Sequence, residues 1–313
     1  MTLGDANGHV LVIGSAGMDI VGRAASDLQP GTSNPGFLRV SYGGTARNVA
    51  ENIARLGADV VLITAVGDDS EGERLLNETA TAGVNVEPSL VVPDQRTGTY
   101  LAILDKHGNL HLGMDDMRLV EAITPGYLRK LSGLFKQAAA VFVDANLTPR
   151  TLNTTVSMAK SAGIPVAADP TSVSLAPVLN PHLPDFWLIT PNEAEAEVIC
   201  PHPVPHADVD RAIEAARHLV SEGVDIVIIT MAEFGLGYAS ADRVGHVPAL
   251  QTEIVDPTGA GDALSAAVMF ALLNEIPLDE AVQLGLSAAA ETLRIRGTVS
   301  PNLSLELLYE HLR

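Results

Sequence analysis

Short apolar runs that alternate with amphipathic segments are the feature that most limits the folds open to this chain. Six runs rich in valine, isoleucine and alanine lie at residues 9–14, 59–66, 139–144, 164–169, 186–190 and 225–230. They are mostly apolar throughout, as strands covered on both faces tend to be. Residues 208–222 carry apolar side chains on one helical face and end at Gly223. The alternation predicts a doubly wound, largely parallel sheet with helices on both faces.

Two stretches interrupt this rhythm. Residues 20–42 are rich in turn-forming residues and end in a strand-like alternation, and residues 97–112 contain two short strand patterns joined around residues 107–109. Both predict a small antiparallel sheet that would cover a pocket at the carboxyl ends of the parallel strands. Ordinary connecting hairpins explain the same pattern. Without an internal repeat or a linker, residues 1–313 are expected to form a single domain whose lid comprises these two stretches.

Composition narrows the classes of partner and the compartment. The chain has 313 residues, 47% of them hydrophobic, and its net charge of −19 opposes binding to nucleic acid or anionic lipid. The sequence contains no apolar run of the roughly 18–20 residues needed to span a membrane. The single cysteine, Cys200, excludes an intrachain disulfide and is expected to be a small buried hydrophobe. Because residues 1–8 do not resemble a secretory signal, we expect a cytoplasmic protein.

Only four lysines occur, and none lies in the G-x-x-x-x-G-K-[ST] context of a Walker-type phosphate loop. If this acidic chain binds a nucleoside triphosphate, it must therefore use backbone N–H groups, a few arginines and a metal ion. Gly14-Ser-Ala-Gly17 follows an expected strand but lacks the third glycine of a dinucleotide fingerprint, which disfavours a dehydrogenase.

The most informative stretch is Asp256-Pro-Thr-Gly-Ala-Gly-Asp262, which precedes apolar residues at helical spacing. Gly259, Ala260 and Gly261 are expected to present unpaired N–H groups at a helix start, where an anion can approach. Asp262 in the first turn can orient a hydroxyl and accept its proton, although helix capping alone also favours aspartate. Because a helix start stabilises a carboxylate, we expect a weak base that mainly positions the hydroxyl.

A second glycine motif, Gly43-Gly44-Thr-Ala-Arg-Asn48, leads into another expected helix, with Gly57 and Gly67 at the ends of the next elements. Together with residues 256–262, it resembles the signatures of the ribokinase-like (PfkB-type) carbohydrate kinase family, and the resemblance covers about residues 10–301. It implies a three-layer α/β/α sandwich with a small β lid. It also implies ATP- and Mg²⁺-dependent transfer of a phosphoryl group to a primary hydroxyl.

The resemblance also implies roles for residues on the acceptor side. Asp262 would be the catalytic base, and Gly259–Gly261 the anion hole. Asp19 would grip sugar hydroxyls, although a turn aspartate is the simpler interpretation. The other substrate-binding positions implied are Gly43, Gly44 and Asn48, with Gly44 letting backbone approach the sugar.

On the nucleotide side, Asn192 and Glu195 match the family's N-x-x-E pattern, whose glutamate organises water around Mg²⁺. The same spacing is a plain helix-start signal. Thr230 and Gly235 border the nucleotide, but Ala232 stands where members usually carry glycine. Some members bind a monovalent cation such as K⁺ through loops that match Asp256–Thr258 and residues 297–300, so Asp256 and Thr258 are candidate ligands.

Within the family, residues 30–36, 115–117 and 144–147 look most similar to those of kinases acting on pseudouridine. Thr32, Ser33 and Asn34 would then offer hydrogen bonds to the base from the lid, although a solvated turn has the same composition. The expected reaction is 5′-phosphorylation of pseudouridine. Ribose or adenosine kinases and a catalytically silent nucleoside-binding protein are the alternatives. An exposed lid sheet would also allow a homodimer.

Overall fold

The computed structural model describes residues 8–108 and 110–312, and its body is a nine-stranded sheet in the order β15-β14-β13-β12-β11-β10-β1-β4-β6. The neighbouring pairs from β6 to β13 are parallel, whereas β14 and β15 are antiparallel. The strands are β1 (His9–Ile13), β4 (Val60–Ile63), β6 (Val84–Asn85), β10 (Ala138–Asp144), β11 (Val166–Asp169), β12 (Leu188–Ile189), β13 (Ile226–Thr230), β14 (Leu236–Ser240) and β15 (Val244–Val247). All six expected runs therefore contribute strands to this sheet. Two segments used in the sequence analysis fall outside the described residues. They are residues 1–7, which do not resemble a secretory signal, and Asn109, which lies between the two strand patterns of residues 97–112.

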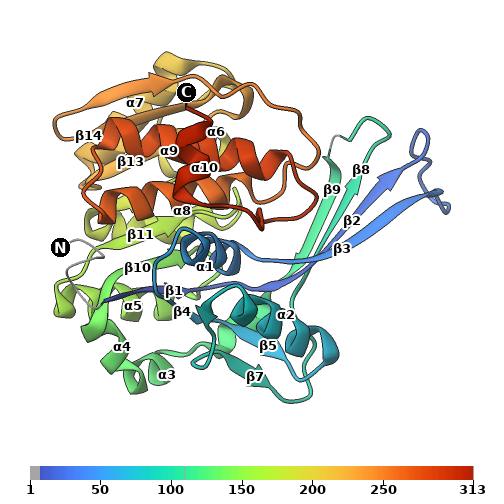
Figure 1. The fold of residues 1–313 in the computed structure, drawn as a ribbon, viewed down its shortest axis with the longest axis horizontal. Helices are drawn as coiled ribbons and strands as arrows, with labels where there is room; N and C mark the ends of the chain where they lie inside the picture. The colour runs from blue at the N-terminus through green and yellow to red at the C-terminus, as the bar shows by residue number, and fades with distance from the viewer. Residues whose placement is uncertain (1–7, 109, 313) are drawn as a thin grey trace.

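Helices cover both faces of the sheet, which confirms the three-layer sandwich (Figure 1). In β1, Val10 and Val12 pack toward one apolar core and Leu11 and Ile13 toward the other, because successive side chains of a strand point to opposite faces. The first core includes α1 (Thr45–Arg55), α8 (Ala260–Leu273) and α9 (Leu278–Leu293), and the second includes α3 (Pro125–Lys130), α4 (Ser132–Gln137), α5 (Pro149–Ala162), α6 (Glu193–Ile199) and α7 (Val209–Ser221). The remaining α-helices are α2 (Ser70–Thr81) and α10 (Leu305–Glu310), and short 3₁₀ helices span Arg118–Ala122, Ala176–Asp185 and Ala232–Phe234.

A four-stranded lid extends from the body, built from both predicted segments (Figure 1). Its strands, in spatial order, are β3 (Gly36–Gly43), β2 (Gly17–Ala24), β8 (Thr99–Leu104) and β9 (Leu110–Asp116). The β2–β3 and β8–β9 pairs are antiparallel, as expected, but β2 and β8 are parallel because both run outward from the body. A separate parallel pair joins β5 (Ala65–Gly67) to β7 (Leu90–Val92).

Cys200 is 6% exposed, and burial raises the pKa of its thiol to about 12, so the thiol is held protonated as a small apolar side chain. Among the described residues, no helix is both long and apolar enough to span a membrane.

Candidate active site

The two glycine motifs meet where helices α1 and α8 begin. Asn48 in the first turn of α1 donates from Nδ2 to Oδ2 of Asp262 in the first turn of α8, at 2.7 Å. The two residues are 214 positions apart in the chain. Asn48 is 3% exposed and Asp262 is half-buried. The acceptor-side motif and the expected base therefore share one site.

The start of α8 has free N–H groups beside open space. The first intrahelical bond runs from Ala263 N to Gly259 O, so the N–H groups of residues 260–262 have no intrahelical partner. Gly259 has φ 83°, and a Cβ there would lie 2.1 Å from the carbonyl oxygen of Thr298. A Cβ at Gly261, in contrast, would meet no atom within 4 Å. An anionic oxygen can approach these amides.

Asp262 is a stronger base than the sequence suggested. Burial and the neighbouring carboxylates of Asp19, Asp144 and Glu195 raise the pKa of Asp262 to about 7, against the lowering effect of the Asn48 hydrogen bond. Desolvation and crowding of acidic groups thus outweigh the effect of the helix start on this pKa, while the role of Asp262 in positioning a hydroxyl stays a prediction. A carboxyl group with this pKa is suited to accept a proton near neutral pH.

Asp19 on β2 lies beside the first glycine motif. A Cβ at Gly43 would lie 2.0 Å from Asp19 Oδ2, so the glycine leaves room for this carboxylate. Asp19 is 4% exposed, and burial raises its pKa to about 6 although Arg47 and Arg39 act to lower it. The structure thus places a buried carboxylate within the electrostatic reach of Asp262.

The structure shows why position 44 requires glycine, which the sequence did not reveal. It caps α1 with φ 97°, and a Cβ there would lie 2.6 Å from Ala16 Cα, so protein backbone fills the space a side chain would need. The first N–H groups of α1 also have protein acceptors, since Ala46 N donates to Asp144 Oδ2 at 3.2 Å and Arg47 N to a backbone oxygen at 3.1 Å.

Two further carboxylates were missed as site residues. Asp144, at the end of β10, is fully buried and accepts hydrogen bonds from Ser15 N, Ser15 Oγ, Ala46 N and Asn146 N. It therefore joins the β1–β2 loop to the start of α1. Asp169, at the end of β11, accepts from Thr171 N at 2.8 Å. The sequence signal was available, because both aspartates end apolar strand runs.

Asp169 also connects to helix α8. Thr190 Oγ1 donates to Asp169 Oδ2 at 3.2 Å and lies 2.7 Å from Ser265 Oγ, one turn after Asp262. Asp169, Thr190 and Ser265 are all at most 9% exposed. Burial and the nearby carboxylates of Glu195 and Asp262 raise the pKa of Asp169 well above its usual range. This buried connection fixes α8 against the ends of β11 and β12.

Asn192 and Glu195 form a reciprocal capping box at the start of α6, with both hydrogen bonds at 2.9 Å. The helix-start interpretation of this pair is thus realised, while its metal role stays a prediction. Glu195 Oε1 accepts no hydrogen bond from the described residues, so it is available to metal-bound water. The described residues contain no group of three or more side chains of the His, Cys, Asp or Glu type arranged to hold a metal. Mg²⁺ would therefore fit here only with much of its water retained.

The loop after β13 keeps the backbone of a glycine turn without the glycine. Ala232 has φ 47°, a left-handed conformation that costs a non-glycine residue roughly 1–2 kcal/mol. Met231 N donates to Gly235 O at 2.8 Å and closes the turn that follows Thr230. A Cβ at Gly235 would lie 2.0 Å from Val247 O, so glycine is required there.

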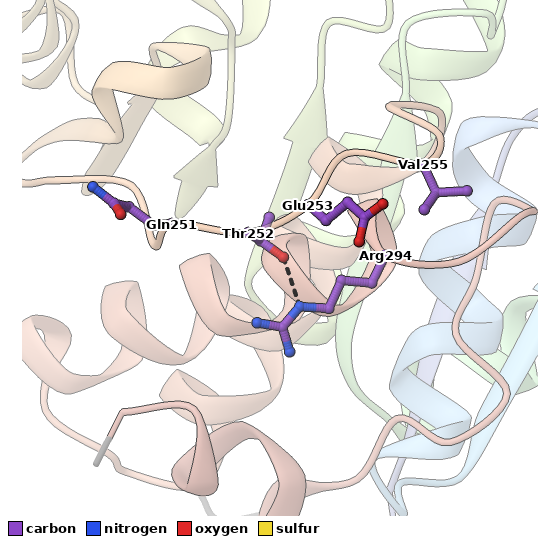
Figure 2. A pocket seen from close by; sticks show the side chains of 5 residues that line it. All are labelled: Gln251, Thr252, Glu253, Val255 and Arg294. Carbon is purple, nitrogen blue, oxygen red and sulfur yellow. Dashed lines mark hydrogen bonds between the residues drawn. The ribbon is translucent and has the colours of Figure 1, made fainter.

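Two cavities lie near these segments, although neither is lined by Asp19, Asn48 or Asp262. One of about 600 Å³ lies beside the strand-to-helix loop just before Asp256, and in it Arg294 Nε donates to Thr252 Oγ1 at 2.6 Å (Figure 2). It is lined by Gln251, Thr252, Glu253, Val255 and Arg294. The other, of about 530 Å³, lies between the lid and the body and includes Leu101, Met114 and Asn146.

Thr32, Ser33 and Asn34 are exposed in the β2–β3 loop, at the outer end of the lid (Figure 1). The Asn34 side chain bonds within this loop, accepting from Gln29 N at 2.7 Å and donating to Gln29 O at 3.0 Å. The structure does not bring these three residues to Asp262, so their contact with a base stays a prediction.

A layered α/β sandwich with a lid, a helix start open to anions and an adjacent carboxylate of raised pKa defines a class, the small-molecule phosphotransferases. The sequence pattern of the pfkB family carbohydrate kinases matches residues 7–305. The chain belongs to this family and is a sugar or nucleoside kinase, with an alcohol group as acceptor.

Relatives in the family differ in their substrates. The chain is 30% identical to the pseudouridine kinase of Escherichia coli K12, over 95% of this chain and 94% of the relative. It is 29% identical to the guanosine-inosine kinase of Exiguobacterium acetylicum, over 91% of this chain and 94% of that relative. A structure from E. coli described as a ribokinase II with ATP and Mg²⁺ superposes with a TM-score of 0.83 at 21% identity. The superposition covers 97% of this chain and 99% of that chain. The fold is thus ribokinase-like, and a kinase of this fold holds ATP and Mg²⁺.

Proposed function

We propose that this kinase transfers the γ-phosphoryl group of ATP to the 5′-hydroxyl of pseudouridine. The observation that carries the chemistry is the Asn48–Asp262 hydrogen bond beside the open amides of residues 260–262. The sequence identity of 30% to a pseudouridine kinase along nearly the whole chain supports the choice of acceptor.

In this proposal Asp19 and Asn48 hold hydroxyl groups of the acceptor, and Asp262 orients the reacting hydroxyl and receives its proton. The free N–H groups of residues 260–262 offset the charge that develops on the transferred group. ATP bound here would supply the phosphoryl group, and Mg²⁺ would offset the charge of its phosphates. Glu195 would hold the metal through water, and Asn192 would lie beside the nucleotide. Thr230, Gly235 and the cavity beside Thr252 and Arg294 would take the nucleoside part of ATP.

A substrate panel tests the acceptor. With ATP and Mg²⁺, we expect the highest kcat/KM for pseudouridine among pseudouridine, uridine, guanosine, inosine, adenosine and ribose. A preference for guanosine or inosine would favour the second candidate, which the 29% identity to a guanosine-inosine kinase supports. Thermal stabilisation by nucleosides without phosphoryl transfer to any of them would favour a silent nucleoside-binding protein.

The lid loop is proposed to contact the base of the acceptor when the acceptor is bound. Asn34→Ala is expected to raise KM for the nucleoside about threefold to tenfold while KM for ATP stays unchanged, since only the acceptor would touch this loop. Equal changes in both constants would instead indicate a general loosening of the loop that Asn34 closes through Gln29.

We also propose that the protein is cytoplasmic and that it forms a homodimer. The dimer contact is proposed to lie on the lid. The edge strands present Leu38, Val40, Leu112 and Met114 on one face, each 51–79% exposed. Across the sheet, Ile20, Leu101 and Ile103 join them in two apolar rows. A second copy would cover the same face by twofold symmetry. Sedimentation should show a dimer that Leu38→Glu converts to monomer; a wild-type monomer at micromolar concentration would contradict this.

A further inference from the structure

The loop that precedes the catalytic helix contains a buried carboxylate with two protein partners. Asp256 is 5% exposed; its Oδ1 accepts from Thr258 N at 3.0 Å, and its Oδ2 forms an ion pair with Arg39 Nη1. Arg39 belongs to β3 of the lid, and Asp256 lies in the loop that leads into α8. The ion pair therefore connects the lid to the loop before the proposed anion-binding site. A buried carboxylate requires such a countercharge, because an unpaired charge is costly away from water.

The hydroxyl groups of the facing loop, residues 297–300, are also engaged. Thr298 Oγ1 donates to Tyr42 O at 2.9 Å and lies 3.5 Å from Arg47 Nη1. Ser300 Oγ donates to Glu291 Oε1 at 3.0 Å. The carbonyl of Thr298 is packed against Gly259, where a Cβ would lie 2.1 Å away.

The side-chain oxygens of Asp256, Thr298 and Ser300 are thus already engaged by protein partners. They do not fit a monovalent cation while Arg39 of the lid contacts Asp256. A K⁺ ion at Asp256 would have to share its carboxylate with a guanidinium group and would be repelled by it. Arg39 is also close enough to Asp19 to lower the pKa of that carboxyl group, so its charge acts on both the acceptor side and the phosphate side of the site.

Arg47, the other arginine beside Asp19, is not free to take this role. Its Nη2 forms an ion pair with Glu51, its Nε donates to Thr79 Oγ1, and its Nη1 donates to Tyr42 O at 3.2 Å. The lid therefore provides the countercharge of Asp256 through Arg39.

We propose that Arg39 replaces the monovalent cation at the Asp256 loop, so that this kinase needs no K⁺ and its phosphate-binding loop acquires its countercharge when the lid closes. The inference builds on the proposed phosphotransferase site, but its main readout, thermal unfolding, requires no turnover. Failure of the proposed reaction would therefore leave this test interpretable.

The test compares wild type, Arg39→Gln and Arg23→Gln in KCl and in tetramethylammonium chloride of equal ionic strength. Arg23 is the matched control, since it lies on lid strand β2 but donates to the carbonyl of Lys106 instead of reaching the Asp256 loop. For wild type, and likewise for Arg23→Gln, the melting temperature in KCl is expected to equal that in tetramethylammonium chloride. Arg39→Gln should melt about 5 °C lower in tetramethylammonium and recover in KCl, because K⁺ can then approach Asp256.

Initial rates give a second readout. We expect wild-type rates within about twofold in the two salts and at least about tenfold activation of Arg39→Gln by K⁺. Arg39→Lys, which keeps a cation on the lid, should remain independent of K⁺. A K⁺-specific increase in the melting temperature or rate of wild type would overturn the inference, as would an Arg39→Gln variant without a K⁺-specific response.

Discussion

Helix α1 begins at Gly44 and helix α8 at Gly259, and both N-cap glycines have positive φ angles, 97° and 83°. At α1, the protein itself supplies acceptors, because Asp144 and a backbone oxygen take the first N–H groups. At α8, Gly261 faces open space and the first N–H groups have no intrahelical partner. Two similar motifs thus have different uses, one joining parts of the fold and one remaining open to an anionic ligand.

The largest expected effect comes from the carboxylate at the open helix start. Asp262→Asn should lower kcat by about 10²–10⁴-fold, since the amide cannot accept the proton. Nucleoside binding should remain, because the amide oxygen can still accept from Asn48 Nδ2. We expect the melting temperature at pH 8 to rise, as one charge leaves a crowded acidic site. Steady-state kinetics and calorimetry measure both; near-normal turnover would remove Asp262 from the role of base.

A matched pair of substitutions separates the two helix starts. Gly261→Ala should keep or raise stability by up to about 1 kcal/mol, because its Cβ has room, yet lower kcat/KM for ATP about tenfold or more. Gly44→Ala should instead cost about 2 kcal/mol of stability, because of its φ and its contact with Ala16. Urea unfolding and ATP kinetics distinguish the two. If Gly261→Ala left ATP kinetics intact, the helix start of α8 would not be the phosphate site.

The pH dependence follows from the raised pKa of Asp262. The carboxyl group must be ionised to accept a proton, so kcat/KM should be level above pH 7 and fall about tenfold per pH unit below it. Protonation of Asp19, whose pKa is raised to about 6, should steepen the loss at lower pH. The profile of wild type, with Asp262→Asn as the control without this dependence, provides the measurement. A flat profile from pH 5 to 8 would contradict the assignment.

The smallest effect is expected from the buried support of α8. Thr190→Val removes the hydroxyl between Asp169 and Ser265, and we expect a stability loss of about 1–3 kcal/mol and a severalfold lower kcat. Thr155→Val is the control, since Thr155 is buried and its hydroxyl bonds within α5, on the opposite face of the sheet. Equal kcat in the two variants at similar stability would show that Thr190 only supports the fold.

Local patterns were sufficient for much of this protein. The apolar runs predicted six of the nine strands of the main sheet but not β6, β14 or β15, and the two interruptions predicted the lid. The glycine motifs predicted where α1 and α8 begin, because turn and helix-start preferences depend on residues close together in the chain. The similarity of both motifs to one family also indicated the correct class of enzyme.

Other properties depend on contacts between distant segments. The pKa of Asp262 is raised first by burial, and Asn48, Asp19, Asp144 and Glu195, which come from four other parts of the chain, also act on it. No local pattern reports either effect. The same holds for the Asp169–Thr190–Ser265 connection and for the Arg39–Asp256 ion pair. The sequence by itself determined which elements form and which chemical groups they carry. Only the tertiary structure decided which helix start stays open and how basic its carboxylate becomes, because burial and electrostatic neighbours are properties of the packed chain.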